Sequence, residues 1–153
     1  MMIADVLREP LVIPALLGTT KEKVLEELAA RVVSEHPEVE GERLVEVLWE
    51  REKLSSTAIG EGIAIPHARL PRVSQIVGAF GRHPAGIDYQ SLDGQPTKLF
   101  FLVVAPEDSA GQHLKALARI SRLLKEASTR ARLMNAGDQS DLYRCLIEAD
   151  SQH

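Results

Sequence analysis

The stretch KLFFLVVAP, residues 98–106, constrains the fold more than any other part of the sequence. It is a continuous apolar run without alternation of polar and apolar residues, which is typical of a strand covered on both faces. The run ends at Pro106, and a strongly periodic helical segment follows from about Ser109 to Glu126. A buried strand that leads directly into a helix favours an α/β fold.

The other segments agree with this class. The apolar stripe of residues 24–32 predicts an amphipathic helix over 20–35, begun by a capping box of Thr19 and Glu22. Further helices are expected over 42–53 and on both sides of a break at 135–137, and short strands over 62–65, 75–81 and 87–89. Strands interleaved with helices predict an α/β sandwich with a mixed sheet, flanked by helices on both faces, in a single domain spanning residues 1–153.

Charge and composition exclude several classes of protein. The net charge is −4 and no long Lys/Arg run occurs, so neither nucleic acid nor an anionic membrane is an expected partner. The N-terminus MMIADVLREP lacks the pattern of a signal peptide, and no apolar run is long enough for membrane insertion. We therefore expect a cytoplasmic protein. The single cysteine, Cys145, rules out an internal disulfide, and its helical spacing from Leu142 and Leu146 predicts a core residue.

The segment STAIGEGIAIPHARL, residues 56–70, carries the first candidate functional residue. Pro66 lacks an N–H and fixes its own φ, so we expect it to end a strand and to place His67 at the carboxyl end. In open α/β sheets, ligands bind at that edge. Gly60 and Gly62 predict a tight turn whose backbone N–H groups face an anion.

A second histidine is expected at the same place. His113 lies near the first turn of the helix after the buried strand, and it shares a helical stripe with Leu117, Ile120 and Leu124. Its side chain should therefore point inward. The connection from strand to helix returns at the carboxyl edge, so the imidazoles of His67 and His113 should meet there.

Two histidines with an arginine and hydroxyls nearby, but without an acidic cluster, favour nucleophilic catalysis on phosphorus. A neutral imidazole nitrogen attacks the phosphoryl group while the other ring nitrogen keeps its proton, usually by donating to a carbonyl or carboxylate. Donors must stabilise the negative charge of the phosphoryl group. The candidate donors are Arg51, Ser55, Ser56, Thr57 and His113, with Arg69 a weaker candidate because it lies beyond His67 in the strand.

Structural explanations exist for each of these residues. A histidine at a strand end or on an apolar stripe is often a satisfied structural group. The position of Arg51 at a helix end is explained if it does no more than complement the helix dipole. Ser56 and Thr57 are residue types that are ordinary in turns. His36, His83 and His153 are assigned no role. A metal site is not expected, because the sequence has no His-x₃-His pair.

The segment REKLSSTAIGEGIAIPHARL, residues 51–70, resembles the active-site signature of the enzyme IIA domains of the fructose/mannitol class of the bacterial phosphotransferase system. The segment LDGQPTKLFFLVVAPEDSAGQHLKALARISRLL resembles their second hallmark, a buried strand followed by a helix with a histidine. The resemblance implies a sheet of about five strands. It also implies that His67 is the phosphorylated histidine, modified at Nε2, and that His113 and Arg51 are its active-site partners.

The same resemblance implies the partners. The phosphoryl donor would be HPr or an HPr-like protein, the acceptor in sugar systems a IIB domain, and no cofactor would be needed. The absence of a GxxxxGK loop agrees with this, because it argues against direct use of ATP.

Neither a IIB cysteine loop nor a membrane-spanning transporter is attached, so the chain looks most like the stand-alone nitrogen-regulatory IIA proteins. Three outputs stay open: regulation, sugar transport with a separate IIB, and a binding module gated by phosphorylation. The downstream target, a homodimer and the cis or trans state of Ile65–Pro66 also stay open.

Overall fold

The computed structural model describes residues 1–152. These residues form five α-helices, namely α1 (Lys21–Glu35), α2 (Gly41–Leu54), α3 (Ala110–Lys125), α4 (Ala127–Asn135) and α5 (Gln139–Ser151). They also form six strands, namely β1 (Val12–Ile13), β2 (Ala58–Gly60), β3 (Ile63–Ala64), β4 (His67–Leu70), β5 (Val77–Ile87) and β6 (Thr97–Pro106). Two short 3₁₀ turns, Ile3–Asp5 and Glu9–Leu11, precede β1.

The strands form one open mixed sheet in the order β1-β5-β6-β3-β2, and β4 also pairs with β6. The central strand β6 is antiparallel to β5 and parallel to both β3 and β4. The expected α/β class with a mixed sheet is confirmed. One difference is that β5 is a single strand, where two pieces over 75–81 and 87–89 were expected.

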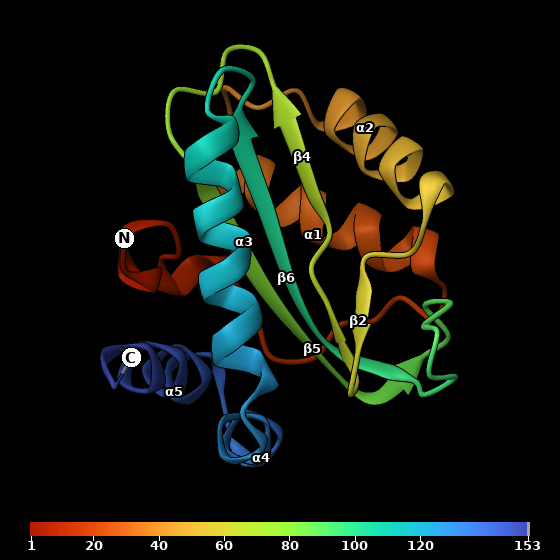
Figure 1. The fold of residues 1–153 in the computed structure, drawn as a ribbon, viewed down its shortest axis with the longest axis vertical. Coiled ribbons are helices and arrows are strands. Elements are labelled where there is room, and N and C mark those ends of the chain that lie inside the picture. Colours follow the sequence, from red (N-terminus) through yellow and green to blue (C-terminus); the bar gives the residue numbers. More distant parts are fainter. Residues whose placement is uncertain (153) are drawn as a thin grey trace.

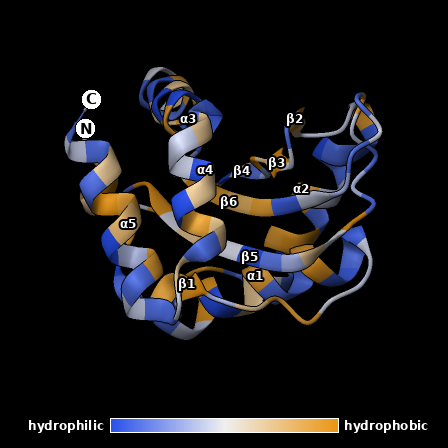
Figure 2. Ribbon diagram, turned by 90° about the horizontal axis from the view of Figure 1, so that it is seen from below, coloured by the Kyte–Doolittle hydropathy of each residue, from blue (hydrophilic) through white to orange (hydrophobic). Residues whose placement is uncertain are grey.

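Helices cover the sheet on both sides. Helix α3 crosses in front of the strands and α1 runs behind them, while α2 packs against α1 and β4 (Figure 1). Apolar residues of the helices and strands gather between the layers (Figure 2). Residues 99–105 of β6 are all buried, which confirms that this strand is covered on both faces. Cys145 is partly buried and packs against the core, as expected.

Helix α1 begins at a different residue from the one that the capping pattern indicates. The N-cap is Thr20, whose Oγ1 accepts a hydrogen bond from the N–H of Lys23 at 3.2 Å. The expected capping box of Thr19 and Glu22 is therefore wrong: the cap is one residue later, and it is a single hydrogen bond to Thr20. A threonine at either position can act as an N-cap, because its hydroxyl accepts from an N–H that the first helical turn leaves free.

Strands β3 and β4 are two parts of one interrupted path beside β6. Ile63 and Ala64 pair with Leu99 and Phe100, and after Ile65–Pro66 the pairing resumes with His67 opposite Val103. The register is the same on both sides of the interruption, and the Pro66 carbonyl accepts a hydrogen bond from the N–H of Val103 at 3.0 Å. The expectation that Pro66 ends the strand is therefore wrong: His67 begins β4. All peptide bonds of the described residues are trans, Ile65–Pro66 included.

The turn between β2 and β3 has the backbone conformation that its glycines predict. Gly60 and Gly62 have φ of 86° and 80°, and Glu61 between them has φ of 58°. The anion that this turn faces is a side chain of the protein itself, because the Glu61 N–H donates to the Asp93 carboxylate at 2.9 Å. The turn therefore fixes the end of the hairpin between β5 and β6.

No helix formed by residues 1–152 has the length and apolarity that a membrane span requires.

Candidate functional site

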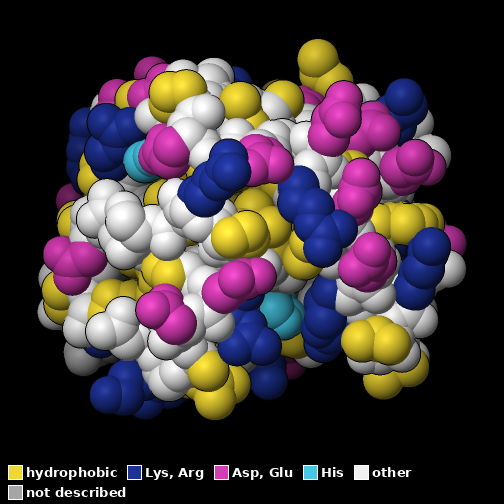
Figure 3. Space-filling model, turned by 90° about the horizontal axis from the view of Figure 1, so that it is seen from above, with side chains coloured by type: hydrophobic (Ala, Val, Ile, Leu, Met, Phe, Trp, Pro, Cys, Tyr) yellow, Lys and Arg dark blue, Asp and Glu magenta, His cyan; other side chains and the backbone are white. Residues whose placement is uncertain are grey.

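A pocket of about 680 Å³ lies between α2, β4 and α3. Its lining includes Arg51 from α2, His67 and Arg69 from β4, and His113 from α3, together with Glu107 and several apolar side chains. The face of the molecule seen in Figure 3 carries a histidine between Lys and Arg side chains, with acidic side chains next to them. The pocket thus combines two imidazoles with two guanidinium groups.

The hydrogen bonding of His67 defines which of its ring nitrogens carries the proton. Its Nδ1 lies 2.9 Å from the carbonyl oxygen of Ile65. A carbonyl oxygen can only accept, so Nδ1 carries the proton and donates it. In the neutral ring, the lone pair is therefore on Nε2. This is the arrangement that attack on phosphorus requires, and the interruption at Ile65–Pro66 brings the Ile65 carbonyl to the ring.

Strand periodicity places the guanidinium group of Arg69 on the same face of β4 as His67. In β4 the side chains of Ala68 and Leu70 are buried on one face, whereas His67 and Arg69 lie on the other. Arg69 therefore lines the same pocket. Its position two residues along a strand is what brings it there, although it was the weaker candidate from the sequence.

His113 approaches His67 from the first turn of α3. The two ring centroids are 5.3 Å apart, with an interplanar angle of 78°. The His113 side chain is buried, and its Nε2 has no hydrogen-bond partner among residues 1–152. The expected inward orientation and the meeting of the two imidazoles are both present. They meet beside the carboxyl half of β6, and His67 lies at the amino end of its own strand, not at the expected carboxyl end.

Burial keeps both rings neutral. Desolvation lowers the pKa of His67 below its ordinary value of 6.5, and Arg51 lowers it further, while the hydrogen bond to Ile65 acts in the opposite direction. For His113, desolvation together with His67 and Arg69 lowers the pKa to about 4. At neutral pH the pocket therefore offers unprotonated ring nitrogens beside permanently charged guanidinium groups.

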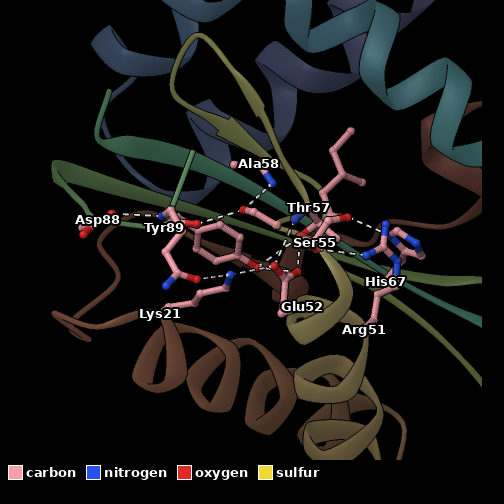
Figure 4. A network of polar contacts seen from close by, with 12 residues as sticks. Lys21, Arg51, Glu52, Ser55, Thr57, Ala58, His67, Asp88 and Tyr89 are labelled. Atoms are coloured by element: carbon pink, nitrogen blue, oxygen red, sulfur yellow. Dashed lines mark hydrogen bonds and ion pairs between the residues drawn. The ribbon is translucent and has the colours of Figure 1, made fainter. Parts of the chain in front are cut away.

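Arg51 lies in the last turn of α2. Its Nη1 donates to the carbonyl oxygen of Ser55 at 3.0 Å, and the side chain lines the pocket. Arg51 thus caps the end of its own helix while it faces His67 (Figure 4). The structural and the functional explanations of this residue are both compatible with the geometry.

The hydroxyls of Ser56 and Thr57 are occupied elsewhere. Ser56 Oγ donates to the carbonyl oxygen of Tyr89 at 2.9 Å, and Thr57 Oγ1 donates to the Glu52 carboxylate. Neither residue is part of the pocket lining. The structure therefore brings Arg51, His67, Arg69 and His113 together, whereas Ser56 and Thr57 lie in the turn behind them.

Sequence reasoning missed the buried ion pair under this turn. Lys21 Nζ lies 2.9 Å from Glu52 Oε1, with 7% and 3% of the side chains exposed. A signal is present in each helix: Glu52 continues the buried stripe of Leu44 and Leu48, and Lys21 begins the stripe of Val24 and Leu28. A charge on an apolar stripe indicates a buried ion pair, but the stripes do not identify the partner.

Metal binding has no candidate here, because among residues 1–152 no group of three or more His, Cys, Asp or Glu side chains is arranged to hold an ion.

Comparison with known protein families decides the classification of the site. Residues 5–149 match the model of the EIIA 2 family of the phosphoenolpyruvate-dependent sugar phosphotransferase system. The chain belongs to this family. Members of this family are phosphoryl-transfer components.

Individual relatives agree with the family. The chain is 44% identical to a nitrogen regulatory protein of Bradyrhizobium diazoefficiens, over 95% of each chain. The crystal structure of nitrogen regulatory protein IIA-Ntr from Neisseria meningitidis matches with a TM-score of 0.87 and 30% identity, covering 94% of this chain and 98% of that one. An Escherichia coli complex of enzyme IIAMtl with phosphorylated enzyme IIBMtl shares the fold, with a TM-score of 0.76 and 22% identity over 93% of this chain and 97% of the other.

Proposed function

We propose that this EIIA chain, as one domain of residues 1–153, is a phosphoryl carrier that accepts its phosphoryl group on Nε2 of His67. One observation carries the proposal: the Nδ1–H of His67 donates to the Ile65 carbonyl, which leaves the lone pair on Nε2. A neutral imidazole of this tautomer is a nucleophile for phosphorus. The donor that fits this chemistry is the phosphohistidine of HPr or of an HPr-like protein.

The transfer exchanges one nitrogen–phosphorus bond for another. The Nε2 lone pair forms the new bond to phosphorus while the bond from phosphorus to the donor's ring nitrogen breaks, and the donor ring leaves with that electron pair. The proton on Nδ1 stays in its hydrogen bond to Ile65, so the positive charge that develops on the ring is stabilised by the carbonyl dipole. No cofactor, metal or nucleotide takes part.

The other pocket residues stabilise the negative charge of the phosphoryl oxygens. Arg51 and Arg69 supply guanidinium groups on different elements, and such groups bind phosphoryl oxygens strongly. The buried Nε2 of His113 has no partner in the part of the chain that the structure describes, and a phosphoryl group on His67 would provide one. Ser56 and Thr57 were also candidates for direct contact; with their hydroxyls engaged, we assign them to holding the turn.

We propose a regulatory output of the nitrogen type, in the cytoplasm, because the relative of highest identity reported above is a nitrogen regulatory protein. The targets would be proteins that dock on the pocket. A sugar-specific role, with transfer to a separate IIB domain, is the second candidate, and the IIA–IIB complex of the same fold supports it.

Incubation with a phosphorylated HPr-like donor tests the carrier function. We expect label on the wild-type protein that is acid-labile and base-stable, as a phosphohistidine is, and complete loss of label in His67→Ala. His36→Ala is the matched control, because its imidazole lies outside the pocket, and it should be labelled as the wild type is. Label that persists in His67→Ala would refute the assignment.

Adding a purified IIB domain to the labelled protein separates the two outputs. Rapid transfer to the IIB cysteine would favour the sugar-specific role, whereas label that remains on His67 in the presence of IIB would favour regulation.

A further inference from the structure

The Glu52 carboxylate is the centre of a buried network behind the pocket. It accepts hydrogen bonds from the Tyr89 hydroxyl at 3.0 Å, from the N–H of Thr57 at 3.0 Å and from the Thr57 hydroxyl, and it forms the ion pair with Lys21 (Figure 4). Lys21 also donates to Gln90 Oε1 at 3.2 Å, and its Nζ lies 4.5 Å from the centre of the Tyr89 ring. Both oxygens of the carboxylate are thus fully engaged.

This network is connected to the reactive ring by two successive hydrogen bonds. The carbonyl oxygen of Thr57 accepts from the N–H of Ile65 at 3.0 Å, and the carbonyl oxygen of Ile65 accepts from Nδ1 of His67 at 2.9 Å. Glu52 fixes Thr57 at both its amide and its hydroxyl. Thr57 therefore fixes Ile65, whose carbonyl selects the tautomer of His67.

The same turn also holds Arg51. Its guanidinium donates to the Ser55 carbonyl, and the next residue, Ser56, is tied through its hydroxyl to Tyr89. Residues 55–57 are thereby fixed from one side by Glu52 and Tyr89, while the Ser55 carbonyl accepts from Arg51 and the Thr57 carbonyl accepts from Ile65. A buried ion pair of this kind adds little to net stability, but removing one partner leaves an uncompensated charge.

We propose that Glu52 is a positioning residue of the phosphoryl-transfer site, acting through Thr57 and Ile65 on the tautomer of His67 and through the 55–57 turn on Arg51. Lys21 supplies the opposite charge beside the buried carboxylate. This inference rests on the proposed function only for its effect on rate; the effect on the ring of His67 is independent of any phosphoryl donor.

The decisive variant is Glu52→Gln, which keeps the shape and removes the charge. In protein with ¹⁵N-labelled histidine, NMR of the ring nitrogens at a pH where His67 is neutral should show almost pure Nδ1–H tautomer for the wild type. We expect a mixture of tautomers for Glu52→Gln, and an initial rate of phosphorylation lowered about 10- to 100-fold, as is common when a supporting hydrogen bond behind a reactive group is lost.

The matched control is Asp150→Asn, which removes the carboxylate from a second buried ion pair. Asp150 Oδ1 lies 2.7 Å from Arg119 Nε, and the Asp150 side chain is 2% exposed. None of these atoms belongs to the pocket. Asp150→Asn should lower stability while leaving the His67 tautomer and the phosphorylation rate at wild-type values.

Two further variants keep the test decisive if Glu52→Gln does not fold. Tyr89→Phe and Thr57→Val each remove one hydrogen bond to Glu52 and keep the ion pair, and both should show part of the tautomer change, while Thr57→Ser should restore the wild-type spectrum. A wild-type tautomer ratio in Glu52→Gln, or in both Tyr89→Phe and Thr57→Val, would overturn the inference. A wild-type protein that accepts no label would overturn the proposed function and leave the NMR comparison intact.

Discussion

At the scale of single residues, the pocket depends on keeping imidazoles unprotonated in the presence of arginines. His113 is 6% exposed and its Nε2 finds no partner within the described residues, so a proton on it would be neither solvated nor neutralised. Burial is the largest cause of its low pKa, and the neighbouring His67 and Arg69 add to it. The unpartnered Nε2 of His113 therefore makes the stability of the fold depend on pH.

Acid should destabilise the protein through this histidine. The unfolded state takes up the proton near pH 6.5 and the folded state only near pH 4. Between these values the unfolded state binds more protons, so the free energy of unfolding falls as the pH falls. The loss of stability caused by His113 reaches its full value, on the order of 3 kcal/mol, at pH 4 and below.

His113→Gln checks this directly, since it removes the titrating group and keeps a polar side chain. Urea unfolding across this pH range should give a weaker pH dependence for His113→Gln than for the wild type. Parallel curves for the two proteins would mean that His113 titrates alike in the folded and unfolded states.

At the scale of elements, the start of α1 matters because the helix begins with Lys21, the partner of Glu52. The cap at Thr20 therefore fixes both the first helical turn and one end of the buried ion pair. Thr19, one residue earlier, is exposed and makes no cap.

Thr20→Ala should lower the free energy of unfolding by about 1 kcal/mol, because the N–H of Lys23 loses its acceptor. Thr19→Ala is the matched control and should change the stability by a few tenths of a kcal/mol at most. Denaturant unfolding of both variants measures the difference. Equal effects at the two positions would show that the capping hydrogen bond contributes nothing.

The helices and the buried strand could be predicted from the sequence because their apolar periodicity is strong. The continuity of β5 could not be predicted, since its segment RHPAG, residues 82–86, has the composition of a loop and separates the two expected strands. The structure tolerates Pro84 there because the pairing with β6 shifts register between Arg82 and Ile87. His83, assigned no role, donates from Nε2 to the Gly18 carbonyl and accepts at Nδ1 from the N–H of Gly86.

The residues of the candidate site also divide into those that could be predicted from the sequence and those that could not. Sequence motifs identified His67, His113 and Arg51, since each carries a chemical group at an informative position. They did not identify Glu52 or Lys21 as partners, because these side chains meet only when α1 and α2 pack together. A local sequence pattern shows that a charge is buried, whereas the identity of its counter-ion depends on the tertiary structure.

At the scale of the whole molecule, a phosphoryl group would change the charge of one face. The chain has a net charge of −4, and the pocket carries two arginines and one glutamate. A phosphohistidine would add about −1.5 to −2 charges at the centre of this patch. Partners that bind the uncharged form should therefore be released by repulsion and by the cost of desolvating the phosphoryl oxygens.

A comparison of His67→Ala with His67→Asp tests this switch, because only the second places a negative charge in the pocket. We expect at least one protein that binds His67→Ala to be lost from His67→Asp in otherwise identical affinity captures. Identical partner sets for the two variants would contradict docking that is controlled by charge.

The depth of the pocket has a consequence for the shape of any partner. His67 is the first residue of a strand and lines a pocket between two helices, so it is not on a loop that can reach outward. A protein that hands over a phosphoryl group should therefore present it on a convex part of its surface that fits between the two helices.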